Sequence, residues 1–525
     1  MAFLQLPLEI LSIILGALGV QDLLRCGETC QVLHTAVSNI PTLQYILALS
    51  AYGLVDNVSN TKPITEKLER ARLTYRAYRD FRWIPHLAIS LDGQYIEQPS
   101  SPMVLRSATS TRLTLMLFGS LVRDAPDRQW TVNPQPAAAF SRTINVSEDL
   151  LVLQTQNIQG SCFHIRTVSD GAAHPQAALP SFPGGVLGVA HQSYGPYLLM
   201  PGANNVHTIW NWKTGMVVSA IRCHYSAIAF LDAEHIALLC LTDLGQFMHV
   251  YHLPSIIFDV NAGIMHPPQY AFGLPTLDPA VMPLACSLLR GPASPYATAG
   301  SPTPTGTCYT DPEDVLLMVK YEQVLPRRQY ALAIRLRSLL QLLTPAHMTH
   351  TTPWGEWGPR HAHAFRLSQR RTSDWDKHSI FGMRRVDMYP TVTPAGILVV
   401  AIRDYHKRRV ALARQETPPE NGSWILVEEG NLDGAWLGMN TLDTCMPYVE
   451  TTVPLPPELQ SQRNAAIVLS INDDGIIAST GFVGSNATIA HVYALRLRLS
   501  VYFSSHTMYE APLCIRYVLY LHYEI

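Results

Sequence analysis

The feature that most constrains this chain is its first apolar stretch, from Leu6 to Val37. Within it, leucine, isoleucine and valine recur three or four residues apart, the spacing of one face of an α-helix. Pro7 suits a first helical turn, and Gly16 and Gly19 interrupt the pattern. The stretch therefore predicts three short helices. So few residues cannot bury all these side chains among themselves, so the rest of the chain or a partner must cover the surplus apolar surface.

The order of residues in this stretch resembles an F-box. The matching segments read LPLEIL, DLLRC and TCQVL, with a leucine near the end of the first helix. F-boxes dock on the Skp-family adaptor of cullin-RING ubiquitin ligases, so the resemblance implies an adaptor-binding surface. Its residues, by matching position, are Leu6, Pro7, Ile10, Leu11, Leu15, Leu18, Leu23, Leu24, Cys30 and Leu33. The family often has a tryptophan at the position of Leu33, a departure that bears on affinity. The alternative is an ordinary helical N-terminus.

Composition excludes several classes of protein. Of the 525 residues, 47% are hydrophobic and 15% are charged, which is typical of a folded chain with a large core. The net charge of −2 gives no overall field that favours nucleic acid or an anionic membrane. Pro7 and Glu9 interrupt the apolar start, and no lysine or arginine precedes it, so we expect neither a signal peptide nor a spanning helix. Nine cysteines without a CxxC pair predict reduced thiols in the cytoplasm or the nucleus.

We expect an F-box over residues 1–48, followed by a linker helix within residues 49–84. Helical spacing runs from Lys62 to Ile84, and lysine and arginine outnumber acids by 7 to 3 between residues 62 and 82. Two interpretations stay open. The arginine stems cover apolar surface of a linker helix, or the helix is a basic docking element.

In residues 85–525 the helical spacing gives way to short β-type runs between turn residues, which predicts an all-β region. Three segments share a pattern of strand, turn and strand: 144–168, 227–253 and 466–495. His207–Val217 resembles the fourth-strand ending of a WD-type blade, with Asn211 where an aspartate is usual. A region this long exceeds one sandwich, whereas repeated blades scale easily. The predicted fold is therefore α+β and multidomain, with a divergent seven-bladed β-propeller after the helices.

Two further segments carry predictions. Gly291–Asp314 is rich in proline, glycine, serine and threonine, which predicts a mobile surface insertion, either a plain loop or a phosphorylatable or partner-binding one. The apolar run Leu513–Ile525 is a candidate closing strand beside the first blade. Pro353–Pro359, PWGEWGP, together with an F-box and a β-rich region, resembles a group of F-box proteins from basidiomycete fungi.

Catalytic motifs are missing from the sequence: there is no HExxH, P-loop, nucleophile elbow or dinucleotide fingerprint. His361 and His363, with Glu356 nearby, are the candidate metal ligands of the sequence, and Asp473–Asp474 is typical of a turn. We therefore expect no enzyme, no cofactor and no metal. The function that the resemblance implies is target recognition for a Skp-cullin-F-box ubiquitin ligase. The alternatives are a scaffold outside a ligase, or a propeller enzyme or small-ligand binder with a helical cap.

Charge is distributed in two opposed blocks. Residues 360–414 hold 12 cations and 4 anions, a balance of +8, and residues 415–475 hold 1 cation and 10 anions, a balance of −9. One interpretation is mutual compensation across a blade boundary. The other is an arginine face that binds an acidic or phosphorylated protein target. The residues of that face would be Arg370, Arg371, Arg384 and Arg385.

Overall fold

The structure is a computed structural model of the 525-residue chain. It describes residues 2–79 and most of 83–495. Outside the described part lie residues 1, 80–82 and 496–525, and the segments 91–93, 99–102, 108–111, 118–127, 134–139, 146–147, 158–159, 184–191, 201–205, 223–226, 243–244, 254–257, 260–263, 266, 276–284, 292–305, 312, 324–327, 349, 368–378, 391–396, 418–423, 429, 434–440, 445, 461–466, 472–474 and 481–488.

Helices form the N-terminal part. In order they are η1 (Ala2–Gln5), α1 (Leu8–Gly16), α2 (Val20–Thr29), α3 (Gln31–Asn39), α4 (Pro41–Tyr52) and α5 (Ile64–Arg79), with the short strand β1 (Leu54–Asp56) before α5. Leu15, Leu23 and Leu43 are fully buried at the centre of the first four helices. Helix α4 begins with a proline at its first turn and ends at Gly53, whose left-handed φ of 64° suits a glycine.

Seven sheets of four or five strands make up most of the described chain beyond residue 83, and their neighbouring strands are almost all antiparallel. The first three are β3 (Gln94–Gln98), β4 (Met103–Ser107), β5 (Leu113–Leu117) and β6 (Arg128–Val132); β7 (Phe140–Asn145), β8 (Leu150–Asn157), β9 (Gly160–Thr167) and β10 (Ser181–Pro183); and β11 (Gln192–Tyr194), β12 (Tyr197–Met200), β13 (Val206–Asn211) and β14 (Met216–Arg222).

The next two sheets are β15 (Ile228–Phe230), β16 (His235–Thr242), β17 (Gly245–His252), β20 (Tyr270–Gly273) and β25 (Thr351–Thr352); and β21 (Ala285–Arg290), β23 (Leu316–Gln323), β24 (Arg328–Arg335) and β26 (Ala362–Arg366). The last two are β27 (Ile380–Phe381), β28 (Arg384–Pro390), β29 (Leu398–Asp404), β33 (Tyr448–Pro454) and β30 (Trp424–Val427); and β34 (Ile467–Ile471), β35 (Gly475–Thr480), β36 (Ile489–Leu495) and β2 (Trp83–Ser90).

Smaller elements complete the described chain. Three two-stranded ladders join β1 with β22 (Cys308–Thr310), β18 (Phe258–Asp259) with β19 (Ile264–Met265), and β31 (Gly430–Asp433) with β32 (Thr441–Thr444). The helices are α6 (Leu336–Gln341), η7 (Pro345–His347), α7 (Trp354–His361), α8 (Lys407–Ala413) and α9 (Pro457–Gln460).

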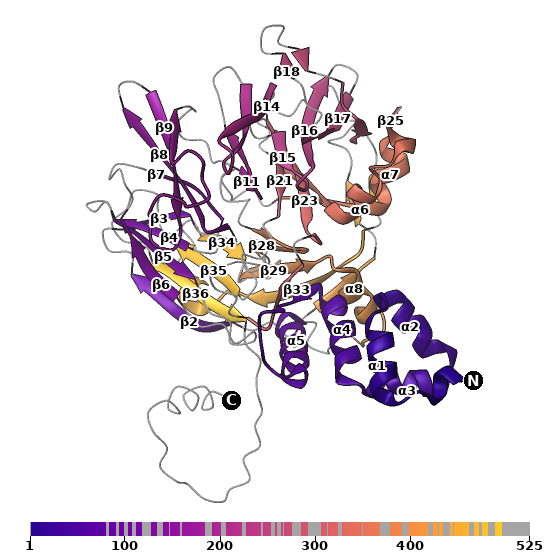
Figure 1. Ribbon diagram of the computed structural model, residues 1–525. Coiled ribbons are helices and arrows are strands. Elements are labelled where there is room, and N and C mark those ends of the chain that lie inside the picture. The colour runs from indigo at the N-terminus through magenta and orange to yellow at the C-terminus, as the bar shows by residue number, and fades with distance from the viewer. Residues whose placement is uncertain are drawn as a thin grey trace, which may run out of the picture.

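The sheets follow one another along the chain, each mostly a meander of sequential strands. In four places the first strands of neighbouring meanders touch: β7 contacts β11, β11 contacts β15, β15 contacts β21, and β27 contacts β34. Meanders that sit side by side around a centre are the architecture of a β-propeller. Figure 1 shows the sheets beside one another, with the N-terminal helices at one side, where α4 contacts α8.

The predicted meanders are confirmed. Residues 144–168 hold β8, β9 and the end of β7, residues 227–253 hold β15, β16 and β17, and residues 466–495 hold β34, β35 and β36. The WD-like segment His207–Val217 needs a correction, because β13 is the third strand of its sheet and β14 follows as the fourth. Asn211 still makes the expected turn, since its Oδ1 accepts from the backbone N–H groups of Lys213 at 3.0 Å and Thr214 at 3.1 Å.

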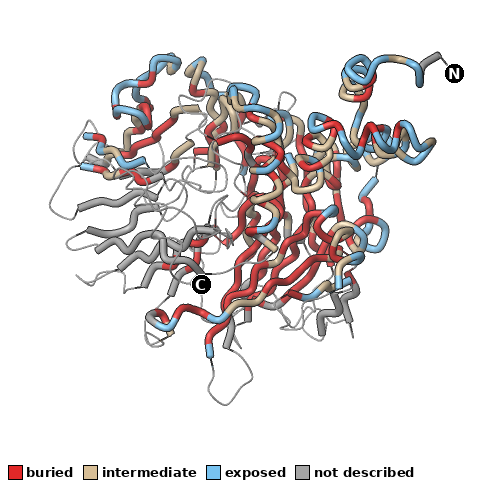
Figure 2. The backbone as a smooth tube through the Cα atoms, turned by 90° about the horizontal axis from the view of Figure 1, so that it is seen from below, coloured by how far each residue is buried: buried red, intermediate tan, exposed pale blue. Residues whose placement is uncertain are grey.

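Trp212 ties two neighbouring sheets together after that turn. Its side chain is buried, its Nε1 donates to the Gly195 carbonyl at 3.1 Å, and the His174 ring meets it edge-on at 4.7 Å. The adjacent Lys213 pairs with Glu148 at 2.8 Å. Buried positions follow the strands of the β region, as Figure 2 shows, whereas the helices α1–α3 are buried on one side only.

Strand β2 joins the last sheet. Trp83–Ser90 pairs with β36 in antiparallel register, from Trp83 opposite Leu495 to Ser90 opposite Ile489. A strand from the start of the β region therefore completes a sheet from its end. The predicted closing strand Leu513–Ile525 lies outside the described residues.

The predicted mobile insertion Gly291–Asp314 is wrong for its described end. Strand β22 pairs with β1, and Thr307 and Cys308 are fully buried. Residues 292–305 lie outside the described part. Backbone pairing with a strand far away in sequence holds the 306–310 segment in place, and composition alone does not reveal such pairing.

Candidate functional site

The residues that match the F-box pattern separate into two groups. Leu11, Leu15, Leu23 and Leu33 are buried and hold the helices together. The side chains of Leu6, Leu18, Leu24 and Cys30 are half-buried, and Pro7 and Ile10 are exposed. The pattern therefore contains both the core of the helical part and a share of its surface.

Helix α1 also presents a second apolar face. Ile10, Ile13 and Ile14 are 43%, 71% and 38% exposed, and their spacing of three and four residues puts them on one side of the helix. Leu8, at the start of α1, and Val32, on α3, add exposed apolar area. We call Ile10, Ile13 and Ile14 the α1 strip. The F-box residue order did not include Ile13 or Ile14. The signal was an α1 sequence whose only polar residues are Glu9 and Ser12, so that its apolar surface is wider than one core can cover.

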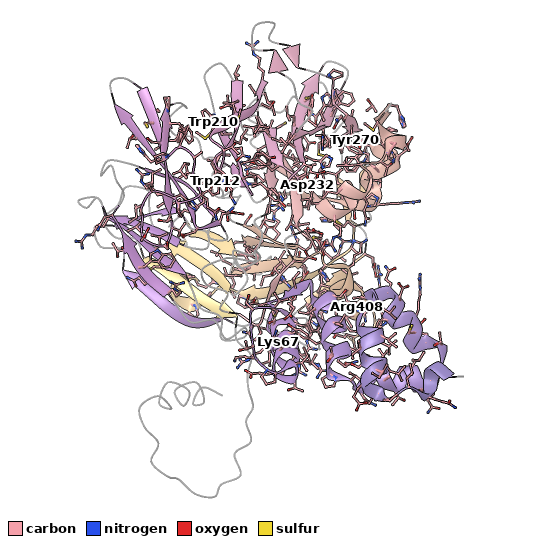
Figure 3. The ribbon with its side chains drawn as sticks, viewed as in Figure 1. Lys67, Trp210, Trp212, Asp232, Tyr270 and Arg408 are labelled. Atoms are coloured by element: carbon pink, nitrogen blue, oxygen red, sulfur yellow. The ribbon has the colours of Figure 1, made fainter. Side chains whose placement is uncertain are left out.

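The helical part is fixed to the β region through β1 and α5. The Tyr45 hydroxyl donates to Asp56 at 2.7 Å, and the buried Lys67 ammonium pairs with the same carboxylate at 3.1 Å. Asn57 Nδ2 donates to the Gly306 carbonyl at 2.7 Å, beside the β1–β22 ladder. These contacts set one orientation for α1–α4 relative to the sheets. Figure 3 labels Lys67 at this joint, and also Arg408 on α8.

The expected arginine face is wrong for Arg384 and Arg385. Arg384 is 7% exposed and its Nε donates to Asp404 at 3.0 Å. Arg385 is fully buried, pairs with Asp387 at 2.7 Å, and lies over the Phe365 ring at 4.0 Å. Neither guanidinium can meet a target without breaking these contacts. Arg370 and Arg371 lie outside the described residues.

Among the described residues, ion pairs between the opposed charge blocks lie within one sheet or its connections, not across a boundary between sheets as expected. Arg403 on β29 pairs with Glu450 on the adjacent β33 at 2.8 Å and with Asp387 on β28 at 3.0 Å. Arg414 and Glu428 make a second pair between the two blocks at 2.6 Å. The Arg403–Glu450 pair therefore neutralises one charge of each block within the sheet of β27–β33.

His363 is a core residue of the same region. It is 4% exposed and packs between the Phe365, Tyr405 and Tyr448 rings. Burial, together with the charges of Arg403 and Arg385, lowers its pKa to about 3, so the imidazole is neutral. Among the described residues no group of three or more His, Cys, Asp or Glu side chains is placed to hold a metal ion.

The tryptophan-rich segment Pro353–Pro359 has a packing role. Trp357 on α7 is 1% exposed, its Nε1 donates to the Gly273 carbonyl at 2.9 Å, and its ring meets Phe272 at 5.4 Å. A Cβ at Gly358 would lie 2.1 Å from the Trp354 ring, which explains the glycine. The segment therefore packs α7 against β20, through the contacts of Trp357 with Phe272 and Gly273.

Comparisons with known proteins give structural likeness only. No protein-family model matches the chain, and no curated protein sequence matches it. Similar solved structures include the C-terminal WD40 domain of Sif2, the WD40 domain of Toxoplasma gondii coronin and the WD40 β-propeller domain of Doa1, each at 9% identity. The matches cover 79%, 80% and 79% of this chain and 99%, 90% and 97% of those chains, with TM-scores of 0.32, 0.34 and 0.31. At these scores the assignment to the propeller type rests on the order and contacts of the sheets.

None of the described helices is long and apolar enough to cross a membrane.

Proposed function

We propose that this chain is the substrate-recognition subunit of a Skp-cullin-F-box ubiquitin ligase. Helices α1–α3 bind the Skp-family adaptor, and through it a cullin, while the β region binds a protein target. The observation that carries the proposal is the α1 strip, an apolar face that no other part of the described chain covers. In Figure 1, α1, α2 and α3 project away from the sheets, so a partner can reach them.

In this role the chain catalyses nothing. It holds a target near the ubiquitin-loaded enzyme and so raises the effective concentration of the target's lysines. A fixed orientation favours this, because a rigid joint keeps the target at a constant distance from the ligase. The ladder of β1 and β22 and the buried Lys67–Asp56 pair support such a joint. Nine cysteines without a CxxC pair support a place in the cytoplasm or nucleus.

We further propose that the β region closes as a seven-bladed propeller. The support is the count of seven sheets with four or five strands in the described residues, and the pairing of β2 with β36. Pairing of an early strand with the last meander removes the open edges that would otherwise invite aggregation.

The experiment is affinity purification from the organism that makes the protein, with mass spectrometry of what copurifies. The full chain is compared with Ile10→Glu/Ile13→Glu, which alters exposed residues and leaves the buried Leu11 and Leu15 in place. The control is Val58→Glu/Ile425→Glu, at positions that are 83% and 51% exposed and lie elsewhere.

We expect a Skp-family adaptor and a cullin with the full chain and the control, and neither with the α1 strip variant. An adaptor without a cullin would indicate a scaffold outside a ligase. Equal recovery of the adaptor with the strip variant would contradict the proposed surface.

A further inference from the structure

A second surface lies at the joint between the helices and the β region. Helix α5 contributes Arg72, Arg76 and Arg79, and α8 contributes Arg408. Arg76 and Arg408 are exposed, and Arg72 and Arg79 are half-buried. We call these four residues the joint patch. Arg72, Arg76 and Arg408 have no carboxylate partner among the described residues, unlike the paired arginines of β28 and β29.

The geometry of α5 arranges the patch in a line. Positions 72, 76 and 79 are four and three residues apart, so they lie on one stripe of the helix, about 10 Å long. Helix α8 contacts α4, and α4 packs along α5, which brings Arg408 beside the stripe. Burial raises the pKa of Tyr52, at the end of α4, and the charges of the four patch arginines oppose that rise. The electric fields of the four arginines therefore overlap at the Tyr52 hydroxyl.

Aromatic rings and Arg409 form the floor of the patch. The Tyr52 and Tyr75 rings stack at 4.4 Å, and Arg409 lies over Tyr75 at 5.5 Å and over Trp424 at 5.1 Å. Arg409 Nη1 donates to the Tyr75 hydroxyl at 3.2 Å, and burial raises the pKa of that hydroxyl to about 12, so it stays protonated. Arg409 is 4% exposed and pairs through Nη1 with Glu416 at 3.4 Å, and Arg79 approaches the same carboxylate at 3.7 Å. Arg72, Arg76 and Arg408 are therefore the patch arginines that can take a further carboxylate.

We propose that the joint patch binds an extended acidic peptide segment of a partner protein. Alternate side chains of an extended segment lie about 7 Å apart on one side, so a run of aspartate and glutamate matches a line of arginines. Guanidinium forks bind carboxylates with two parallel hydrogen bonds. Nucleic acid fits less well, because the chain carries a net charge of −2 and the stripe is short. The proposal is independent of adaptor binding by α1.

The test is fluorescence anisotropy with the full chain and a labelled octapeptide of alternating glutamate and aspartate. A glutamine–asparagine octapeptide and a single-stranded oligothymidylate of equal charge are the comparison probes. The patch variant is Arg72→Gln/Arg76→Gln/Arg408→Gln. The matched control, Arg25→Gln/Arg128→Gln/Arg222→Gln, removes three exposed arginines elsewhere. Thermal unfolding of each variant checks that it is folded.

We expect the acidic peptide alone to bind, with affinity about tenfold lower in the patch variant, unchanged in the control, and falling as salt rises. No binding of the acidic peptide to the full chain would overturn the proposal. So would an equal loss in both variants, since it would show a general charge effect. Equal binding of the oligothymidylate would assign the patch to polyanions at large and contradict a peptide site.

Discussion

Replacement of Trp357 tests how the tryptophan-rich segment acts. The side chain is 1% exposed and contacts Phe272 and Trp354, and its Nε1 donates to the Gly273 carbonyl. Truncation of a buried tryptophan to alanine costs about 3–5 kcal/mol of unfolding free energy. Phenylalanine keeps most of the apolar contact but removes the donor, and a buried carbonyl without its partner costs about 1–3 kcal/mol. We therefore expect Trp357→Phe to lose less stability than Trp357→Ala.

The assay is urea unfolding followed by far-ultraviolet circular dichroism, which does not depend on tryptophan fluorescence. Met216→Ala, at a position 67% exposed, serves as the control and should stay within about 0.5 kcal/mol of the unmodified chain. A loss below about 1 kcal/mol for Trp357→Ala would refute the packing role. Equal losses for the two tryptophan variants would show that the hydrogen bond, not the ring, carries the effect.

Two further predictions concern buried groups of the β21–β26 sheet and of the β27–β33 sheet. His363 has a pKa of about 3 in the folded chain against an ordinary value of 6.5, so its contribution to stability is complete above pH 6.5 and is lost as pH falls toward 3. Between pH 6.5 and 5 the unmodified chain should lose about 2 kcal/mol more unfolding free energy than His363→Phe, as measured by urea unfolding. Equal losses would contradict a buried, neutral His363. Arg385→Gln removes one partner of the buried Asp387, which keeps its pair with Arg403, and should cost about 1–3 kcal/mol of unfolding free energy. Arg414→Gln, in the exposed pair with Glu428, should cost less than about 1 kcal/mol. Similar losses in both variants would mean that burial does not decide the effect.

The sequence predicted the meanders because their signals are local. In residues 227–253 alternating apolar positions are interrupted by turn residues such as Asp232, whose carboxylate accepts from the backbone N–H groups of Glu234 and His235. Strand period and turn chemistry need no knowledge of the rest of the chain.

The sites were harder to predict because burial depends on the whole fold. Leu11 and Ile13 look alike in a helical pattern, yet one is 3% and the other 71% exposed. Counting charges could not reveal that Arg384 and Arg385 face carboxylates on the same or adjacent strands. The composition of the 291–314 segment likewise gave no sign that Cys308 would pair with β1. Each of these features depends on contacts between distant parts of the sequence.

Direct titration of the purified chain with a purified Skp-family adaptor, by isothermal calorimetry, tests the central claim. Truncating one residue at the centre of an interface costs roughly 2–4 kcal/mol when that residue dominates binding. We predict measurable binding to the full chain, loss of at least about 30-fold in affinity with Ile13→Glu, and no change with Val58→Glu. Absence of binding to the full chain, or equal affinity for all three proteins, would contradict the proposal that the α1 strip holds the adaptor.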